Sequence, residues 1–160
     1  MSSRSLVRAA VYAALYAALT LAPGLNALAY GQVQFRVAEA LLVFACFDPA
    51  AVLGLAMGTA AGNLGSPMMP VDVPVGAALT LVSAVLMHAV GPHVPALAVP
   101  VAVNAFGVAG MLALILGLPY WASVVWVGIG EAAVLWTLGL VLLLVVRRNR
   151  ELFGLPRPAS

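Results

Sequence analysis

The sequence predicts an all-α integral membrane protein, a bundle of six transmembrane helices with both termini in the cytoplasm. Of its 160 residues, 64% are apolar and only 8% are charged, whereas soluble domains contain about 25% charged residues. Each crossing needs about 20 residues, so the chain has room for one bundle and no second domain. Most of the arginines flank the first and last apolar runs: Arg4, Arg8, Arg147, Arg148 and Arg150. The positive-inside rule then places both ends in the cytoplasm, which makes the number of crossings even.

Composition also excludes several classes of function. The small positive charge is explained by the cytoplasmic ends of the bundle and gives no indication of nucleic acid binding. Cys46, the single cysteine, cannot form an intrachain disulfide, and His88 and His93 lack further ligands for a metal site. Because no GxxxxGK[ST] loop and no nucleophile with a neighbouring base occurs, we expect neither ATP hydrolysis nor catalysis, and no cofactor.

The first apolar run predicts a helix over 6–22 that ends at Pro23 and Gly24. Alanines recur at every fourth position of this run, and small residues at that spacing allow another helix to approach closely. The following Ala27-Leu28-Ala29 is similar to a signal-peptide cleavage site. The run is longer than the usual apolar region of about 7–15 residues in such signals, however, so we expect the segment to be retained.

The next two helices are predicted over 37–47 and 51–64, after an outer loop at 24–36, and Asp48-Pro49 forms the turn between them. Both helices are short for a full crossing. The second carries Gly54, Gly58 and Gly62, a doubled small-xxx-small pattern. This pattern predicts tight packing against a neighbouring helix.

The last three helices are predicted over 72–90, 96–116 and 121–146, followed by an arginine-rich cytoplasmic tail at 147–160. Turn-forming residues separate them. Pro100 predicts a kink near the inner end of the fifth helix. Tyr120 and Trp121 are suited to the outer membrane interface.

Polar side chains within the apolar runs are the candidate functional residues, because an ionisable group in the membrane costs about 2.5–3.5 kcal/mol on insertion scales. Glu131 lies about 15 Å and Asn104 about 18 Å below the outer surface at the helical rise per residue, so we expect the two to meet near the midplane. A pocket that is open to the outside is predicted by this pair together with the polar residues of the outer half, which are Arg36, Glu39, Asn63, Ser66 and Asp72.

Each of these residues also has a structural interpretation. Arg36 and Glu39 lie three residues apart on one helical face, and an interfacial salt bridge would explain both. Glu131 is explained equally by protonation or by a structural hydrogen bond to Asn104. For Asp72 the alternative is an N-cap.

Four short motifs resemble the QueT family, the queuosine-precursor substrate-binding (S) components of energy-coupling-factor (ECF) transporters. They are YGQVQFRVAEAL at 30–41, NLGSP at 63–67 followed by Asp72, VNA at 103–105 and VGIGE at 127–131. The resemblance extends roughly from Arg4 to Arg148. The sequence departs from the family pattern at Gln32 and in the proline-rich stretch 92–100.

The resemblance implies a multi-pass protein of the cell membrane, surrounded by lipid, that binds a deazaguanine such as prequeuosine from outside. It also implies docking to a module of one transmembrane coupling protein and two ATPases, which hydrolyse the ATP. In the family the alanine strip of the first helix is the docking face, which here corresponds to Ala9, Ala13 and Ala17. With no repeated half in this chain, the energy for transport must come from such a partner.

The implied ligand has a guanine-like edge, and a carboxylate matches such an edge with two parallel hydrogen bonds. Glu131 or Glu39 is suited to this role, while Asn104 or Asn63 would satisfy the remaining polar atoms of the base. Three further residues have possible roles: Phe35 or Trp121 in stacking on the ring, and Asp72 in binding an ammonium group.

Three alternatives remain open at this stage. The chain is an S component for another vitamin-like metabolite, a non-transporting structural membrane subunit, or, least favoured, a membrane enzyme. Competition by vitamins distinguishes the first from a queuosine-precursor carrier. If the second holds, substitution of Glu131 or Asn104 lowers stability without any loss of ligand binding.

Overall fold

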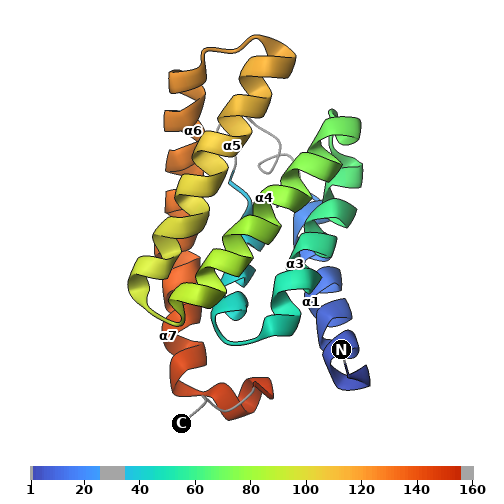
Figure 1. Ribbon diagram of the computed structural model, residues 1–160, viewed down its shortest axis with the longest axis vertical. Helices are drawn as coiled ribbons and strands as arrows, with labels where there is room; N and C mark the ends of the chain where they lie inside the picture. Colours follow the sequence, from blue (N-terminus) through green and yellow to red (C-terminus); the bar gives the residue numbers. More distant parts are fainter. Residues whose placement is uncertain (1, 26–34, 156–160) are drawn as a thin grey trace.

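The computed structural model describes residues 2–25 and 35–155, and all regular secondary structure in these ranges is helical (Figure 1). The predicted signal-like site at 27–29 and most of the predicted outer loop 24–36 lie outside the described residues. The helices are α1 (Ser3–Leu21), η1 (Val37–Cys46), α3 (Pro49–Gly62), η2 (Asn63–Gly65), α4 (Met69–Val90), η3 (Val94–Leu97), α5 (Ala98–Leu116), α6 (Tyr120–Val134), η4 (Leu135–Gly139), α7 (Leu140–Arg148) and η5 (Arg150–Phe153).

The helices α1, α3, α4, α5 and α6 lie side by side in that order, and η1 lies inside the array (Figure 1). Helix η1 contacts α1, α3, α4, α6 and α7. The first turn of α1 and the last turn of α7 lie at the same end of the molecule (Figure 1). We call this end, which carries Arg4, Arg8, Arg147 and Arg148, the arginine end.

Helix η1 is a 3₁₀ helix of 10 residues. Such a helix spans about 20 Å, against about 15 Å for an α-helix of the same length. All of its residues except Val37 and Leu41 are buried. The extended pitch lets this short segment run through most of the interior.

The rods formed by α4, by η3 with α5, and by α6, η4 and α7 together are long and apolar enough to cross a membrane. The last rod runs without interruption from Tyr120 to Arg148 and contains a π-helical turn at η4. The part of the chain that the structure describes is thus all-helical and contains three rods suited to a membrane by length and composition. Six helical segments match the six that the sequence predicts, while the number of crossings and the side on which the termini lie stay predictions.

Helices α1 and α3 pack so closely that the glycines of α3 have no space for a side chain. A Cβ atom at Gly54 would lie 2.5 Å from the backbone oxygen of Ala9, and one at Gly58 would lie 2.8 Å from that of Ala13. The predicted tight packing of the glycine pattern is confirmed, and the neighbour is α1.

The start of the fourth predicted helix and the predicted kink of the fifth differ from the structure. Helix α4 begins at Met69, with Pro70 in the first turn and Met68 as the N-cap, so the alternative that Asp72 is the N-cap is wrong. Proline suits the start of a helix because its missing N–H has no partner there in any case. For the same reason Pro100, in the first turn of α5, breaks no hydrogen bond, and the irregularity near it is the change from η3 to α5 at Ala98.

The main apolar core lies around η1, and a smaller apolar cluster of Met111, Leu112 and Val127 lies in α5 and α6. Large apolar side chains also cover the outer surface of the bundle, as expected for helices that face lipid. Examples are Leu6, Val11, Met57, Leu114, Trp126 and Val141.

Candidate functional site

The first buried carboxylate belongs to Glu39 on η1, whose exposed fraction is 1%. Tyr16 of α1 is fully buried, and its hydroxyl donates a hydrogen bond to Oε1 of Glu39. Close packing of α1 on the glycines of α3 holds Tyr16 in this position, since its Cβ lies against Gly58. The carboxylate of Glu39 thus lies inside the bundle, where Arg36 interacts with it electrostatically.

The second buried carboxylate belongs to Glu131 on α6, which is 4% exposed. Asn104 of α5 donates a hydrogen bond of 2.8 Å from Nδ2 to Oε1 of Glu131. The contact between Asn104 and Glu131 that the sequence predicts is therefore confirmed. It arises because α5 and α6 are antiparallel neighbours joined by a short turn at Gly117.

Arg36 and Asn104 connect the two carboxylates. Arg36 interacts electrostatically with Tyr16, Glu39 and Glu131, and Asn104 interacts with Glu39 as well as with Glu131. We call these five residues, Tyr16, Arg36, Glu39, Asn104 and Glu131, the carboxylate cluster. Segments from four different parts of the chain thus meet at one buried polar site.

Each carboxylate of the cluster has one oxygen atom left over. Within the described residues, Oε2 of Glu39 and Oε2 of Glu131 are buried and have no hydrogen-bond partner. A buried polar atom without a partner costs about 1–3 kcal/mol. Buried polar atoms of this kind indicate a strained or functional site, and the charged neighbour of both carboxylates is Arg36.

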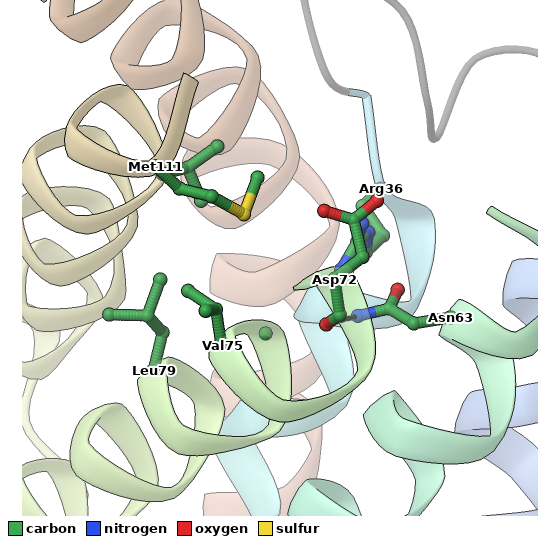
Figure 2. Close-up of a pocket in the computed structure, with 8 residues that line it drawn as sticks. Arg36, Asn63, Asp72, Val75, Leu79 and Met111 are labelled. Atoms are coloured by element: carbon green, nitrogen blue, oxygen red, sulfur yellow. Dashed lines mark hydrogen bonds between the residues drawn. The ribbon is translucent and has the colours of Figure 1, made fainter. Parts of the chain in front are cut away.

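A small cavity of about 20 Å³ lies next to the cluster, and Arg36 belongs to both. Its polar wall consists of Arg36, Asn63 and Asp72, and its other wall is apolar (Figure 2). The apolar wall is formed by α4 and α5 through Val75, Gly76, Leu79, Val108 and Met111. Polar groups on one side and apolar side chains on the other are a common lining of small-molecule sites.

The polar wall is fixed by hydrogen bonds across the turn between α3 and α4. Asn63 donates from Nδ2 to the backbone oxygen of Asp72 at 2.6 Å, and the hydroxyl of Ser66 donates to the Asp72 carboxylate. Oδ1 of Asn63 is buried without a hydrogen-bond partner among the described residues. A Cβ atom at Gly76 would collide with the amide of Asn63, so this glycine leaves space for the asparagine.

The structure brings together six of the seven residues predicted to bind substrate, three in the pocket wall and four in the cluster, with Arg36 in both. The seventh, Phe35, is 37% exposed, and Trp121, the other candidate for stacking, is 71% exposed and packs against Tyr120. Neither aromatic side chain lines the pocket. Their role in binding stays a prediction, as does that of the other six.

Tyr16 is the site residue that sequence reasoning missed. A tyrosine in an apolar helix is usually explained by packing, and the alanines of the same helix indicated a docking face instead of a ligand site. The signal available was the row Tyr12, Tyr16 and Thr20, which places polar groups on one face at every fourth residue. All three are buried in the structure.

The first helix presents two rows of alanines with different surroundings. Ala9, in the predicted docking row, is 4% exposed and lies against Gly54, while Ala13 and Ala17 are half-buried. The parallel row of Ala10, Ala14 and Ala18 is exposed. Because α3 covers Ala9, the exposed surface of α1 is formed by the neighbouring row of Ala10, Ala14 and Ala18.

The remaining candidates have ordinary surroundings. His88 is hydrogen-bonded through Nδ1 to the backbone oxygen of Ala45 at 2.8 Å, and Cys46 is buried with a free thiol. In the ranges 2–25 and 35–155, no three histidine, cysteine, aspartate or glutamate side chains gather as a metal site would require.

The motifs of the sequence coincide with these elements, except that residues 30–34 lie outside the described ranges. The sequence model of the family described as QueT transporter matches residues 6–148. A relative, the queuosine precursor transporter QueT of Lactococcus lactis subsp. cremoris (strain MG1363), is 43% identical over 77 residues. That alignment covers 48% of this chain and 45% of the relative, so less than half of the relative's length is matched. No solved structure matches the chain. Since the family match extends from the first helix to the end of the last rod, the chain belongs to the QueT transporter family, whose members are transporters and not enzymes.

Proposed function

We propose that this chain is the substrate-binding subunit of an ECF-type importer and that it captures a queuosine precursor, a deazaguanine such as prequeuosine, from outside the cell. The observation that carries the proposal is the pair of buried carboxylates, Glu39 and Glu131, each with one oxygen that has no hydrogen-bond partner among the described residues. The name of the Lactococcus lactis relative points to the same class of ligand.

The chemistry of the base explains why carboxylates are needed. A deazaguanine offers adjacent donors, a ring N–H and an exocyclic amine, and hydrogen bonds to an ionised acceptor are roughly twice as strong as neutral ones. Tyr16 donates to Oε1 of Glu39, and Asn104 donates to Oε1 of Glu131. The two oxygens that accept no hydrogen bond among the described residues are the Oε2 atoms, and they belong to different residues. We therefore expect the carboxylate pair, and not one carboxylate alone, to receive the donor edge.

The pocket supplies the other contacts of the ring. Its apolar wall covers one face of a flat bicyclic base, while Oδ1 of Asn63 is available to a further donor. The cavity of about 20 Å³ has room for about one water molecule, so its walls would have to open for a base to enter. Met111 and Leu79 would have to move on binding, and methionine adapts readily because its side chain is unbranched.

Transport requires a partner, because a chain without a nucleotide-binding loop cannot use ATP. We propose that one transmembrane coupling protein and two ATPases form this partner. Docking on α1 would use the exposed row of Ala10, Ala14 and Ala18, bordered by the half-buried Ala13 and Ala17. The site would then face outward, with six crossings of the cell membrane and the arginine end in the cytoplasm.

Reconstitution tests both parts of the proposal. Liposomes that contain the full chain and the three partner subunits should take up labelled prequeuosine only when ATP is present. An excess of thiamine or riboflavin should not compete, and competition by either would favour another metabolite. Uptake by the chain alone would contradict the role of the partner.

A matched pair of variants tests the docking surface. Ala14→Trp places a bulky group on the exposed row of α1 and should abolish capture of the partner subunits, whereas Leu114→Trp, at a position on α5 that is 86% exposed, should not. Equal capture by both variants would place the interface elsewhere.

A further inference from the structure

A row of buried hydroxyl groups leads from the carboxylate cluster into the interface between α3 and α4. The hydroxyl of Tyr16 on α1 donates to the Glu39 carboxylate. Thr59 of α3 interacts with the Tyr16 side chain and donates from Oγ1 to Oγ1 of Thr80 on α4 at 3.0 Å. All three side chains are buried, with exposed fractions of 0%, 0% and 1%. We call Tyr16, Thr59 and Thr80 the hydroxyl row.

A buried threonine in a helix needs no partner outside its own helix. Its hydroxyl can donate to the backbone oxygen four residues earlier, and Thr20 of α1 makes this bond to Tyr16 at 2.9 Å. Thr59 makes it as well, to the backbone oxygen of Leu55 at 3.0 Å. The contacts of Thr59 with Tyr16 and Thr80 are therefore additional to what its burial requires.

The Glu39 carboxylate has three polar neighbours that together set its orientation. Arg36 interacts with its charge, Tyr16 donates to its Oε1, and Asn104 interacts with it as well. A tyrosine oxygen that donates its single proton can still accept, and a threonine hydroxyl rotates to suit its partners, so Thr59 can donate to Tyr16. Consecutive hydrogen bonds strengthen one another. Thr59 would then both hold the Tyr16 hydroxyl and strengthen its bond to Glu39.

Tight packing keeps Thr59 from moving away from Tyr16. A Cβ atom at Gly76 of α4 would lie 3.5 Å from Cγ2 of Thr59 and would collide with the amide of Asn63. Thr59 and Asn63 are four residues apart and therefore share one face of α3. The face that holds Asn63 in the pocket wall is thus also the face that holds Thr59 in the hydroxyl row.

We propose that Thr59 and Thr80 are positioning residues for ligand binding. Neither residue lines the pocket, and both act through Tyr16, which they hold on the carboxylate of Glu39. This inference rests on the proposed function, in which Glu39 receives part of the donor edge of the base. It adds one residue on α3 and one on α4 to those on which the affinity for the ligand depends.

Equilibrium binding of prequeuosine to the full chain in detergent tests this role. Thr59→Val keeps the shape of the side chain and removes the hydroxyl, and it should weaken binding about fivefold, the change expected for one hydrogen bond. Thr59→Ser keeps the hydroxyl and should bind like the wild type. The matched control is Thr20→Val, which removes a buried hydroxyl that bonds to the backbone of its own helix and should leave the affinity unchanged.

A double-mutant cycle with Tyr16→Phe separates positioning from packing. If Thr59 acts through Tyr16, Thr59→Val should cause no further loss of affinity in the Tyr16→Phe background. A packing defect would instead weaken binding by the same factor in both backgrounds. A second cycle combines Thr59→Val with Thr80→Val, and the double variant should bind as Thr59→Val does. This second cycle decides the question if Tyr16→Phe binds too weakly to be measured.

Circular dichroism and size-exclusion profiles show that each variant is folded. Four results overturn the inference: wild-type affinity in Thr59→Val, equal losses in Thr59→Val and Thr59→Ser, an equal loss in Thr20→Val, or additive losses in either cycle. Each of them leaves the proposed function intact, because the wild type still binds. If the folded wild type does not bind prequeuosine, the proposed function fails and this inference fails with it.

Discussion

The hydroxyl of Tyr16 on α1 donates a hydrogen bond to the buried carboxylate of Glu39 on η1, across 23 positions of sequence. This bond connects the helix proposed to dock the partner with the site proposed to hold the ligand.

Tyr16→Phe should weaken both the fold and ligand binding. The substitution leaves Oε1 of Glu39 without its donor, which costs about 1–3 kcal/mol. We expect a lower melting temperature in detergent and weaker binding of prequeuosine. Tyr120→Phe is the control, since no hydrogen bond of its hydroxyl occurs among the described residues, and it should behave as the wild type. If Tyr16→Phe has the same melting temperature and the same ligand affinity as the wild type, Tyr16 is not part of the binding site.

Gly54→Ala should destabilise the bundle. The new Cβ atom would lie 2.5 Å from the backbone oxygen of Ala9 and 2.9 Å from its Cα, and neither helix can move without disturbing the interface. Overpacking of this kind costs about 1–3 kcal/mol. Gly110→Ala on α5 is the control, because its Cβ would meet nothing within 4 Å. Thermal unfolding in detergent measures the difference, and equal melting temperatures would argue against the close contact of α1 and α3.

Asp48 holds the arginine end together, and its two roles are separable. Its Oδ1 accepts a hydrogen bond of 3.0 Å from the N–H of Ala50 as the N-cap of α3, and its Oδ2 pairs with Arg8 at 2.7 Å. Asp48→Asn keeps the cap and loses the ion pair, whereas Asp48→Ala loses both. We expect the alanine variant to be less stable than the asparagine variant by about 1 kcal/mol. Denaturant unfolding that finds the two equal would show that the cap contributes nothing.

Topology is tested with reporters fused after residue 148 or inserted in the turn between α5 and α6. The arginine end should be cytoplasmic and the turn near Gly117 should be outside, as the positive-inside rule predicts. We expect alkaline phosphatase inserted at the turn to be active, as it is outside the cytoplasm, and a green fluorescent protein fused at the C-terminal end to be fluorescent, as it is in the cytoplasm. The reverse pair would place the site on the cytoplasmic side and contradict capture from outside.

Much of the fold was predictable, because hydropathy indicates where the apolar helices lie and glycine spacing indicates which helix packs closely against a neighbour. The meeting of Asn104 and Glu131 was predictable as well, since depth along two antiparallel helices follows from counting residues at a fixed rise. The contact of Gly54 with Ala9 followed from the small-residue pattern, although the sequence did not say which helix would be the neighbour.

Other features depend on tertiary contacts and were not predictable. Hydropathy cannot distinguish a 3₁₀ helix from an α-helix, so the pitch of η1 was missed. The early start of α4 at Met69 was missed because Pro70 indicates a loop as readily as a helix start. Tyr16 was missed because only the packing of α1 on α3 directs its hydroxyl to Glu39.

An equilibrium titration of prequeuosine against the purified chain, its Glu131→Gln variant and its Glu151→Gln control tests the central claim most directly. We predict sub-micromolar binding by the wild type and the control, without competition by guanine or thiamine. Glu131→Gln should bind at least about tenfold more weakly, because an amide nitrogen, which cannot accept a hydrogen bond, replaces one of the two carboxyl oxygens. Unchanged affinity in a folded Glu131→Gln preparation, or no binding by the folded wild type, would contradict the claim that the carboxylate cluster captures the ligand.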